Sequence, residues 1–137
     1  MRYNDDMTQH SVPLRKDVPF SDKWDLSSLF ASDGDWEKAL SEIETLIEKA
    51  AAYKGRLSES DKTLLSALKA YEAADKKLEA VFNYASLQLT ADETDPAAQN
   101  KEGRARMAYT KYIAATSFFN PELQSIPEEK LRAWMEK

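Results

Sequence analysis

The sequence predicts an all-α, bundle-like fold: a long antiparallel helical hairpin, a third long helix and the start of a fourth. The 137 residues include only three glycines and five prolines, the residues that most often interrupt helices. Apolar side chains recur every three or four positions through long segments, as they do on one face of a helix. No segment of strand length alternates between apolar and polar residues, so we expect no sheet.

The start of the chain lacks this helical periodicity. Val12-Pro13-Leu14 and Val18-Pro19-Phe20 are isolated apolar groups beside prolines, which favour extended backbone. We therefore expect residues 1–22 to form an extended or disordered arm. Residues 23–120 are predicted to form a helical lobe, and residues 121–137 the start of a following helical segment that is cut short.

The first long helix is predicted over residues 34–53. Ser32 can cap its start, with Asp35 as the reciprocal partner, and Gly55 is a stop signal. Just before it, Trp24 with Leu26, Leu29 and Phe30 is expected to fold back as an anchor for the helix entrance. The predicted buried stripe comprises Trp36, Leu40, Ile43, Ile47 and Ala50.

The second helix is predicted to begin near Ser58 or Ser60 and to run to about residue 91. The connection from the first helix is short, which favours an antiparallel hairpin. Asp75 interrupts an otherwise regular apolar pattern. The stripe comprises Leu64, Leu68, Tyr71, Leu78, Phe82, Ala85 and Leu89.

The third helix is predicted over residues 96–119. Asp95 supplies a cap and Pro96 fits the first turn, while Asn120-Pro121 is expected to end the helix. Gly103 is a weak point within it. Its predicted apolar residues are Met107, Tyr109, Tyr112, Ile113, Thr116 and Phe119.

A last helix is expected to begin near Ser125. Ser125 and Glu128 have capping-box spacing, and Pro127 would lie in the first turn. Leu131, Trp134 and Met135 would form its apolar face and need a partner.

Composition excludes several classes of function. A net charge of -5 argues against nucleic acid as a partner, because phosphate binding needs a basic surface. No apolar run is long enough to span a membrane, and the polar start does not resemble a secretory leader. The absence of cysteine excludes disulfides and thiolate metal sites and suits a cytoplasmic location.

Few residues are candidates for chemistry. His10 is the only histidine and has no second histidine at helical spacing, so we interpret it as an exposed arm residue rather than a metal ligand. Three carboxylates gather in the segment of Asp92, Glu93 and Asp95. A calcium-binding loop needs a central glycine, which this segment lacks, so we interpret it as a loop followed by a helix cap. Glu128 and Glu129 fit the start of a helix, where acids are favourable.

Basic and aromatic side chains offer two further candidates. Arg104, Arg106 and Lys111 could meet a peptide carboxylate, but a solvated helix face is the favoured interpretation. The aromatic residues could line a groove, although packing in the core is typical of such spacing. These aromatic residues are Trp24, Trp36, Tyr71, Phe82, Tyr84, Tyr109, Tyr112, Phe118 and Phe119.

Four segments in register resemble a known family. They read KWDLSSLFASDGDWEKAL from Lys23, YKGRLSES from Tyr53, YASLQLTADETDP from Tyr84 and SFFNPELQSIPEEKL from Ser117. From about Trp24 to its end the chain resembles the N-terminal region of oligoendopeptidase F, a family of zinc metallopeptidases. None of the four segments is a catalytic signature.

The resemblance implies a non-catalytic helical lobe of a much longer, all-helical enzyme that cleaves oligopeptides. Family members hold zinc through an H-E-x-x-H helix and a later glutamate in their C-terminal part. This chain has a single histidine and therefore cannot contain that motif, so no catalytic, cofactor-binding or metal residue is assigned here. The implied partners are a catalytic domain of the same polypeptide and an oligopeptide substrate, whose channel the lobe would help to shape.

Two other interpretations stay open at this point. The chain could be a stand-alone helical module that presents an apolar groove of the hairpin to a partner helix. An enzyme that uses carboxylates alone would need two acids a few ångströms apart in a cleft, and the sequence gives no such pair a clear location. By itself the chain is expected to be inactive, because it resembles part of a zinc metallopeptidase whose H-E-x-x-H site is not in this sequence.

Overall fold

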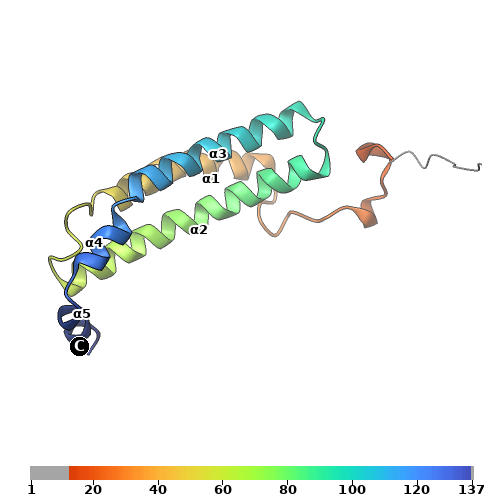
Figure 1. Ribbon diagram of the computed structural model, residues 1–137. Helices are drawn as coiled ribbons and strands as arrows, with labels where there is room; N and C mark the ends of the chain where they lie inside the picture. The colour runs from red at the N-terminus through yellow and green to blue at the C-terminus, as the bar shows by residue number, and fades with distance from the viewer. Residues whose placement is uncertain (1–12, 137) are drawn as a thin grey trace, which may run out of the picture.

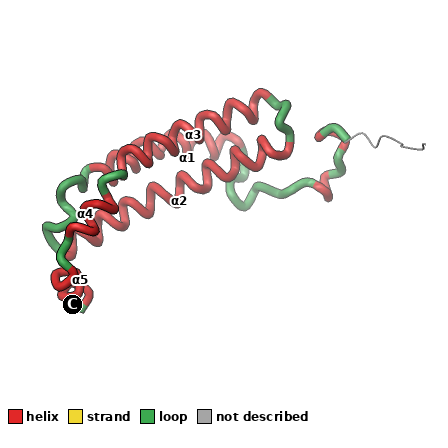
Figure 2. Tube along the Cα trace, viewed as in Figure 1, coloured by secondary structure: helices red, strands yellow, loops and turns green. Residues whose placement is uncertain are grey.

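Three long helices form the body of the protein. The computed structural model describes residues 13–136 and confirms the all-α class, since these residues contain no strand. The long helices lie side by side, and two short helices follow at the end of the bundle farthest from the N-terminal segment (Figure 1; Figure 2). The elements are η1 (Arg15–Asp17), η2 (Phe20–Asp22), α1 (Asp33–Ala51), α2 (Asp61–Ala91), α3 (Pro96–Thr116), α4 (Phe119–Ser125) and α5 (Glu128–Met135).

The long helices begin at the caps that the sequence predicts. The side chain of Ser32 accepts a hydrogen bond from the Asp35 amide, and Ser60 accepts one from the Thr63 amide. Asp95 accepts from the Ala97 amide ahead of the proline that opens α3. Each cap satisfies an amide that has no partner within the helix, which fixes the starting residue.

Contacts between helices define the topology. α2 is antiparallel to α1, because Trp36 Nε1 near the start of α1 donates to the carbonyl oxygen of Val81 late in α2, at 2.9 Å. The predicted antiparallel hairpin is thus confirmed. α3 returns parallel to α1, since Arg104 pairs with Glu37 and, further along both helices, Lys111 pairs with Glu44.

Two apolar clusters hold these elements together. The main core lies between the three long helices, with Trp36, Ile43, Leu78 and Val81 almost fully buried. The base core lies where α4 and α5 join the bundle and comprises Leu57, Leu64, Ala67, Phe118, Phe119 and Ile126. Gly55, in the connection between α1 and α2, has a φ of 78° and donates its amide hydrogen to Glu122 of α4 at 2.5 Å.

The end of the third helix and the start of the last one differ from prediction. α3 ends at Thr116 instead of 119, and Pro121 lies inside the first turn of α4, where its missing N–H costs little. Burial of Phe118 and Phe119 in the base core redirects the chain here. The capping box at Ser125 is also wrong: the Ser125 hydroxyl donates to the Glu122 carbonyl, and Pro127 takes the cap position of α5.

The predicted apolar stripes were partly wrong on α2 and α3. Leu68, Met107, Tyr109 and Ile113 are exposed, whereas small residues face the bundle axis. These small residues let the helix backbones approach closely, which leaves the larger side chains outside. They are Ala67, Ala74, Ala98 and Ala105.

The N-terminal segment was predicted as an arm. Residues 1–12, including His10, lie outside the described residues, and the following segment forms the two short turns η1 and η2. Leu26, Leu29 and Phe30 pack against the main core as predicted for the anchor. Trp24 does not join them, because its side chain is exposed. Among the described residues, none of the helices is long and apolar enough to cross a membrane.

Candidate functional site

A groove of about 740 Å³ opens at the end of the bundle where α2 meets α3. One wall is the segment that leads from η1 into α1, and the other is the end of α2 with the start of α3. This volume lies within the range of ligand pockets. We call it the tip groove, and it is lined by Phe20, Trp24, Phe30, Asp25, Asp92 and Asp95 among other residues.

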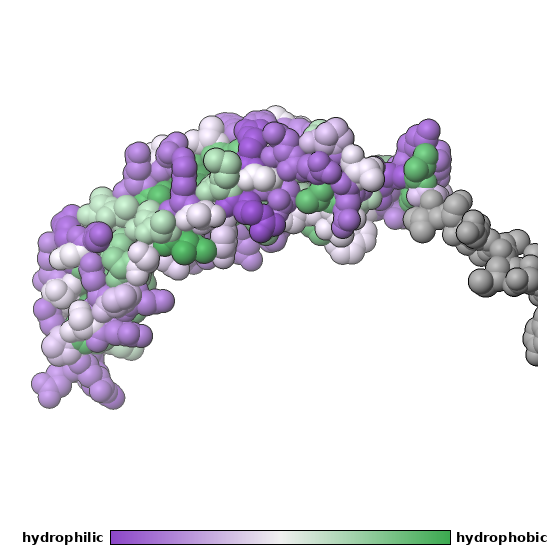
Figure 3. Space-filling model, turned by 45° about the horizontal axis from the view of Figure 1, so that its top comes forward, coloured by the Kyte–Doolittle hydropathy of each residue, from purple (hydrophilic) through white to green (hydrophobic). Residues whose placement is uncertain are grey.

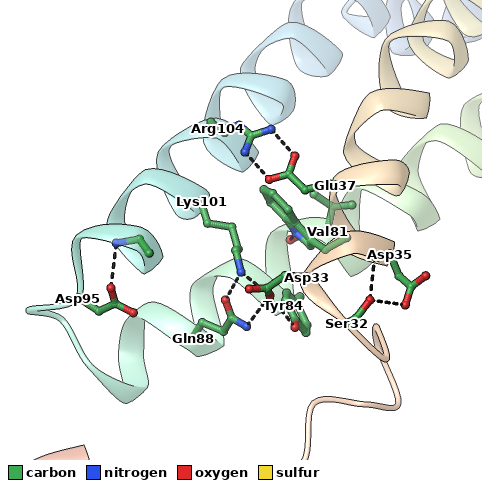
Figure 4. Close-up of polar contacts among 12 residues, drawn as sticks. Ser32, Asp33, Asp35, Glu37, Val81, Tyr84, Gln88, Asp95, Lys101 and Arg104 are labelled. Atoms are coloured by element: carbon green, nitrogen blue, oxygen red, sulfur yellow. Dashed lines mark hydrogen bonds and ion pairs between the residues drawn. The ribbon is translucent and has the colours of Figure 1, made fainter.

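A polar cluster at the floor of the tip groove connects all three long helices. Asp33 of α1 accepts hydrogen bonds at one oxygen, Oδ1, from Tyr84 and Gln88 of α2 at 3.0 and 3.3 Å, and from Lys101 of α3 at 2.5 Å (Figure 4). Lys101 also donates to the Gln88 side-chain oxygen at 2.6 Å. A charged group with this many partners is held in one place, so the cluster fixes the relative position of the helices at this end.

The cluster keeps Asp33 ionised. The hydrogen bond from Lys101 lowers the pKa of Asp33, against a smaller opposing effect of burial. Burial raises the pKa of the Tyr84 hydroxyl, and the nearby carboxylate of Asp33 adds to this effect. Asp33 and Lys101 form an ion pair, so their charges largely neutralise each other.

Trp36 has a structural role next to this cluster. Its indole ring is fully buried, and the cationic groups of Lys101 and Arg104 lie 5.5 and 5.3 Å from its ring centroid. The Arg104 guanidinium reaches both oxygens of Glu37 at 2.6 Å (Figure 4). The prediction that Trp36 packs in the core is confirmed.

The acidic stretch after α2 forms a loop and a cap. Asp92 Oδ1 accepts from the amide and the hydroxyl of Thr94 at 3.0 and 2.6 Å, and Asp95 caps α3. Glu128 pairs with Arg132 within α5. Within residues 13–136, no three histidine, aspartate or glutamate side chains are grouped so that they could hold a metal ion.

The predicted basic patch is already paired with acids. Arg104 and Lys111 lie on one side of α3, as predicted, and bind Glu37 and Glu44 of α1. Arg106 pairs with Glu102 one turn earlier and covers the ring of Phe82. These pairs leave the three side chains poorly suited to capture a peptide carboxylate.

A second, smaller groove runs between α1 and α3. Its volume is about 210 Å³, and Leu40, Ile43, Ile47 and Met107 provide its apolar lining. The ion pairs of Arg104 and Lys111 lie beside it. Apolar residues also surface between hydrophilic ones elsewhere along the bundle (Figure 3), so the surface is not uniformly polar.

The polar cluster was missed by sequence reasoning. Asp33 looks like an ordinary first-turn acid, and Lys101 like one of many helix lysines. Their partnership spans 68 residues, and no local pattern connects positions that far apart. The two residues meet because α1 and α3 run parallel, which brings the starts of both helices together.

Sequence comparison finds related proteins named as peptidases. The chain is 30% identical to oligopeptidase PepF of Bacillus subtilis (strain 168) over 126 residues, which cover 92% of this chain and 19% of that protein. It is 30% identical to group B oligopeptidase PepB of Streptococcus agalactiae, covering 82% of this chain and 19% of that protein. It is 29% identical to the chromosomal oligoendopeptidase F of Lactococcus lactis subsp. cremoris, covering 91% and 21%.

The chain thus spans about a fifth of the length of these curated relatives. No family model matches it. No solved structure matches it either.

Proposed function

Because this chain belongs to the oligoendopeptidase F family, we propose that it forms a non-catalytic helical lobe of an enzyme that hydrolyses oligopeptides. The lobe comprises residues 23–120, and residues 121–137 begin the helical segment that follows it. Its partners are the catalytic domain of the same polypeptide and the oligopeptide substrate. The lobe forms part of the wall of the substrate channel. The full-length enzyme is cytoplasmic.

The observation that carries this proposal is the exposure of most large apolar and aromatic side chains of α3, among which Tyr112 alone is buried in the main core. Alanines 98 and 105 face the bundle axis, whereas Met107, Tyr109 and Ile113 are 66%, 44% and 51% exposed. A helix that exposes its large apolar residues leaves surface that water solvates poorly. Cover by another part of a larger protein removes this cost, so the outer side of α3 is where we expect the lobe to dock.

The catalytic groups are proposed to lie outside this chain. The family implies zinc for full-length members, but the described residues offer no ligand group for it. The sequence has a single histidine, and a zinc site of the H-E-x-x-H type needs two. The residues present therefore do not fit the metal, and no catalytic step is assigned to them.

A chimeric enzyme tests the proposal. In Bacillus subtilis PepF, the matched segment is replaced by the corresponding 126 residues of this chain. We expect the chimera to cleave a fluorogenic oligopeptide in a chelator-sensitive way, within roughly tenfold of the parent kcat/KM. It should also leave a folded protein substrate intact, as expected for a walled channel. An isolated chain that cleaves peptides, or a folded but inert chimera, would contradict the proposal.

Substitutions on α3 sharpen this test. Met107→Gln combined with Ile113→Gln should lower the activity or yield of the chimera, because it makes the docking side polar. In the isolated chain the same change should alter the free energy of unfolding by less than about 0.5 kcal/mol, since both positions are exposed. Ala73→Gln, at an exposed position of α2, is the matched control and should leave the chimera unchanged.

A second candidate is a stand-alone helical module that binds a partner helix. It is favoured by the groove between α1 and α3, whose apolar lining could receive side chains of an amphipathic helix. The groove lies between α1 and α3 and not within the α1–α2 hairpin. This candidate gains support if the chimera is inert while the isolated chain is monomeric and binds a designed amphipathic helix.

A further inference from the structure

We propose that the tip groove binds a peptide segment in which a lysine or arginine side chain stands next to an aromatic or aliphatic one. That the cationic ligand is a peptide rests on the proposed function, a lobe of an enzyme that hydrolyses oligopeptides. The positive charge and apolar character of the ligand follow from the groove itself, through its exposed aromatic rings and its excess of carboxylates.

Exposed aromatic rings form one wall of the groove. Phe20 and Trp24 are 86% and 75% exposed, although the neighbouring Leu26 and Phe30 pack against the main core. The chain thus places two large rings over the groove and does not fold them inward. A ligand with apolar side chains would cover them and remove their surface from water.

Carboxylates outnumber cations around the groove. Lys101 and Asp33 are both in the lining but already neutralise each other. Among residues 13–136, the remaining charged lining consists of Asp22, Asp25, Asp92 and Asp95, against the single guanidinium of Arg15. The groove therefore favours a positively charged ligand.

Two of these carboxylates are held ionised and retain binding capacity. Hydrogen bonds from Ser27 lower the pKa of Asp25, and those from Thr94 lower the pKa of Asp92, with a smaller contribution from Arg15. These hydrogen bonds, like the cap at Asp95, engage the Oδ1 atom of each side chain. A carboxylate can accept further bonds at its second oxygen, so a ligand cation could bind there.

Trp24 is placed to combine both kinds of interaction. It stands in sequence between Asp22 and Asp25, and all three side chains line the groove. An arginine or lysine over the exposed indole would gain a cation–π contact while its charge faces the two acids. An anionic ligand would find Lys101 unavailable, because Asp33 and Gln88 already bind its ammonium group.

Isothermal titration of the purified full chain tests the proposal. The probes are two capped peptides, acetyl-GLRFRLG-amide and its acidic counterpart acetyl-GLEFELG-amide. We expect the cationic peptide to bind at least roughly tenfold more tightly than the acidic one, and its affinity to fall as salt is added. Equal affinity for both peptides, or no binding of either, would overturn the proposal.

Variants locate the binding to the groove. Trp24→Ala should weaken the cationic peptide roughly fivefold, and Asp25→Asn with Asp92→Asn roughly tenfold. Asparagine keeps the local hydrogen bonds of these two positions, so the fold should be preserved. The matched control, Glu79→Gln with Glu129→Gln, removes the same charge from exposed positions outside the groove. Equal losses in the control and the groove variants would refute a defined site.

The outcome is independent of the chimera experiment. Peptide binding to the isolated chain does not require a catalytic domain, and an active chimera does not require an occupied tip groove. Binding by the chain together with an inert chimera would count against the proposed lobe alone. An active chimera whose isolated lobe binds neither peptide would count against the groove alone.

Discussion

α1 and α3 run parallel in the same bundle, but they use their apolar residues in opposite ways. On α1 the large side chains of Trp36, Ile43 and Ile47 face inward and are buried. On α3 the inward positions include Ala98 and Ala105, while Met107 and Ile113 face outward. α1 therefore fills the core with large side chains, whereas the small residues of α3 let its backbone lie close to the other two helices.

The difference shows that apolar content alone does not identify the buried face of a helix. A core has a fixed volume at nearly crystalline density. Once Trp36 and the large residues of α2 fill the main core, the third helix brings one large ring, that of Tyr112, into it and otherwise packs with small residues inward. Its remaining large apolar side chains then lie at the surface, where a partner can cover them.

Truncation of Trp36 should produce the largest effect. Trp36→Ala removes a fully buried ring and its hydrogen bond to Val81, so we expect a loss of about 3–5 kcal/mol in the free energy of unfolding. Trp24→Ala, at an exposed position, should cost less than about 0.5 kcal/mol. Urea denaturation followed by circular dichroism measures both free energies of unfolding. Similar losses for the two variants would contradict the assignment of Trp36 as buried and Trp24 as exposed.

Enlarging a small inward residue tests α3 directly. Ala105→Leu places extra volume at a fully buried position and should destabilise the chain by about 1–3 kcal/mol through overpacking. Ile113→Ala removes volume from the same helix, but from its outer side, and should cost less than about 1 kcal/mol. If Ile113→Ala were the more damaging substitution in the isolated chain, the two faces of α3 would have been assigned the wrong way round.

The sequence was sufficient for the three long helices and their starts. Ser32, Ser60 and Asp95 each carry a local cap signal, because the capping side chain and the amide that it binds lie only two or three residues apart. The helix stripe of α1 was also largely correct, since its large apolar residues are the buried ones. Local chemistry determines these features, so local patterns reveal them.

Features that depend on distant residues could not be predicted. The exposure of Met107 follows from the volume that Trp36 and Leu78 already occupy, and the start of α4 follows from the burial of Phe119. For the tip groove, the acidic stretch at Asp92 was correctly interpreted as a loop and cap. Its position opposite Trp24 depends on the folding of the N-terminal segment, which no periodicity signals.

The polar cluster that connects the two parallel helices should make stability depend on pH. The substitution Lys101→Met removes the charged group of a side chain that is 11% exposed and keeps its aliphatic packing. We expect a loss of about 1 kcal/mol at pH 7 from the removed charged hydrogen bonds.

The sign of the pH dependence follows from Asp33. Its pKa in the folded chain lies below the ordinary value of 3.8, so its contribution is present above that value and is lost as the pH falls through the lower, folded pKa. The difference between wild type and Lys101→Met should therefore shrink in acid below pH 3.8. Urea denaturation at several pH values measures this difference in the free energy of unfolding. A difference that grows as the pH falls would contradict the proposed role of the ionised Asp33.

The smallest effect is expected from the ion pair between Lys111 and Glu44. It joins the same two helices as the polar cluster, at 3.1 Å, but its side chains are 61% and 71% exposed. Water screens both charges, and ordering two long side chains opposes the attraction. A double-mutant cycle of Lys111→Met and Glu44→Gln should give a coupling below about 0.5 kcal/mol. A coupling as large as the effect of Lys101→Met would mean that surface charge, and not close packing at Ala105, holds α3 against α1.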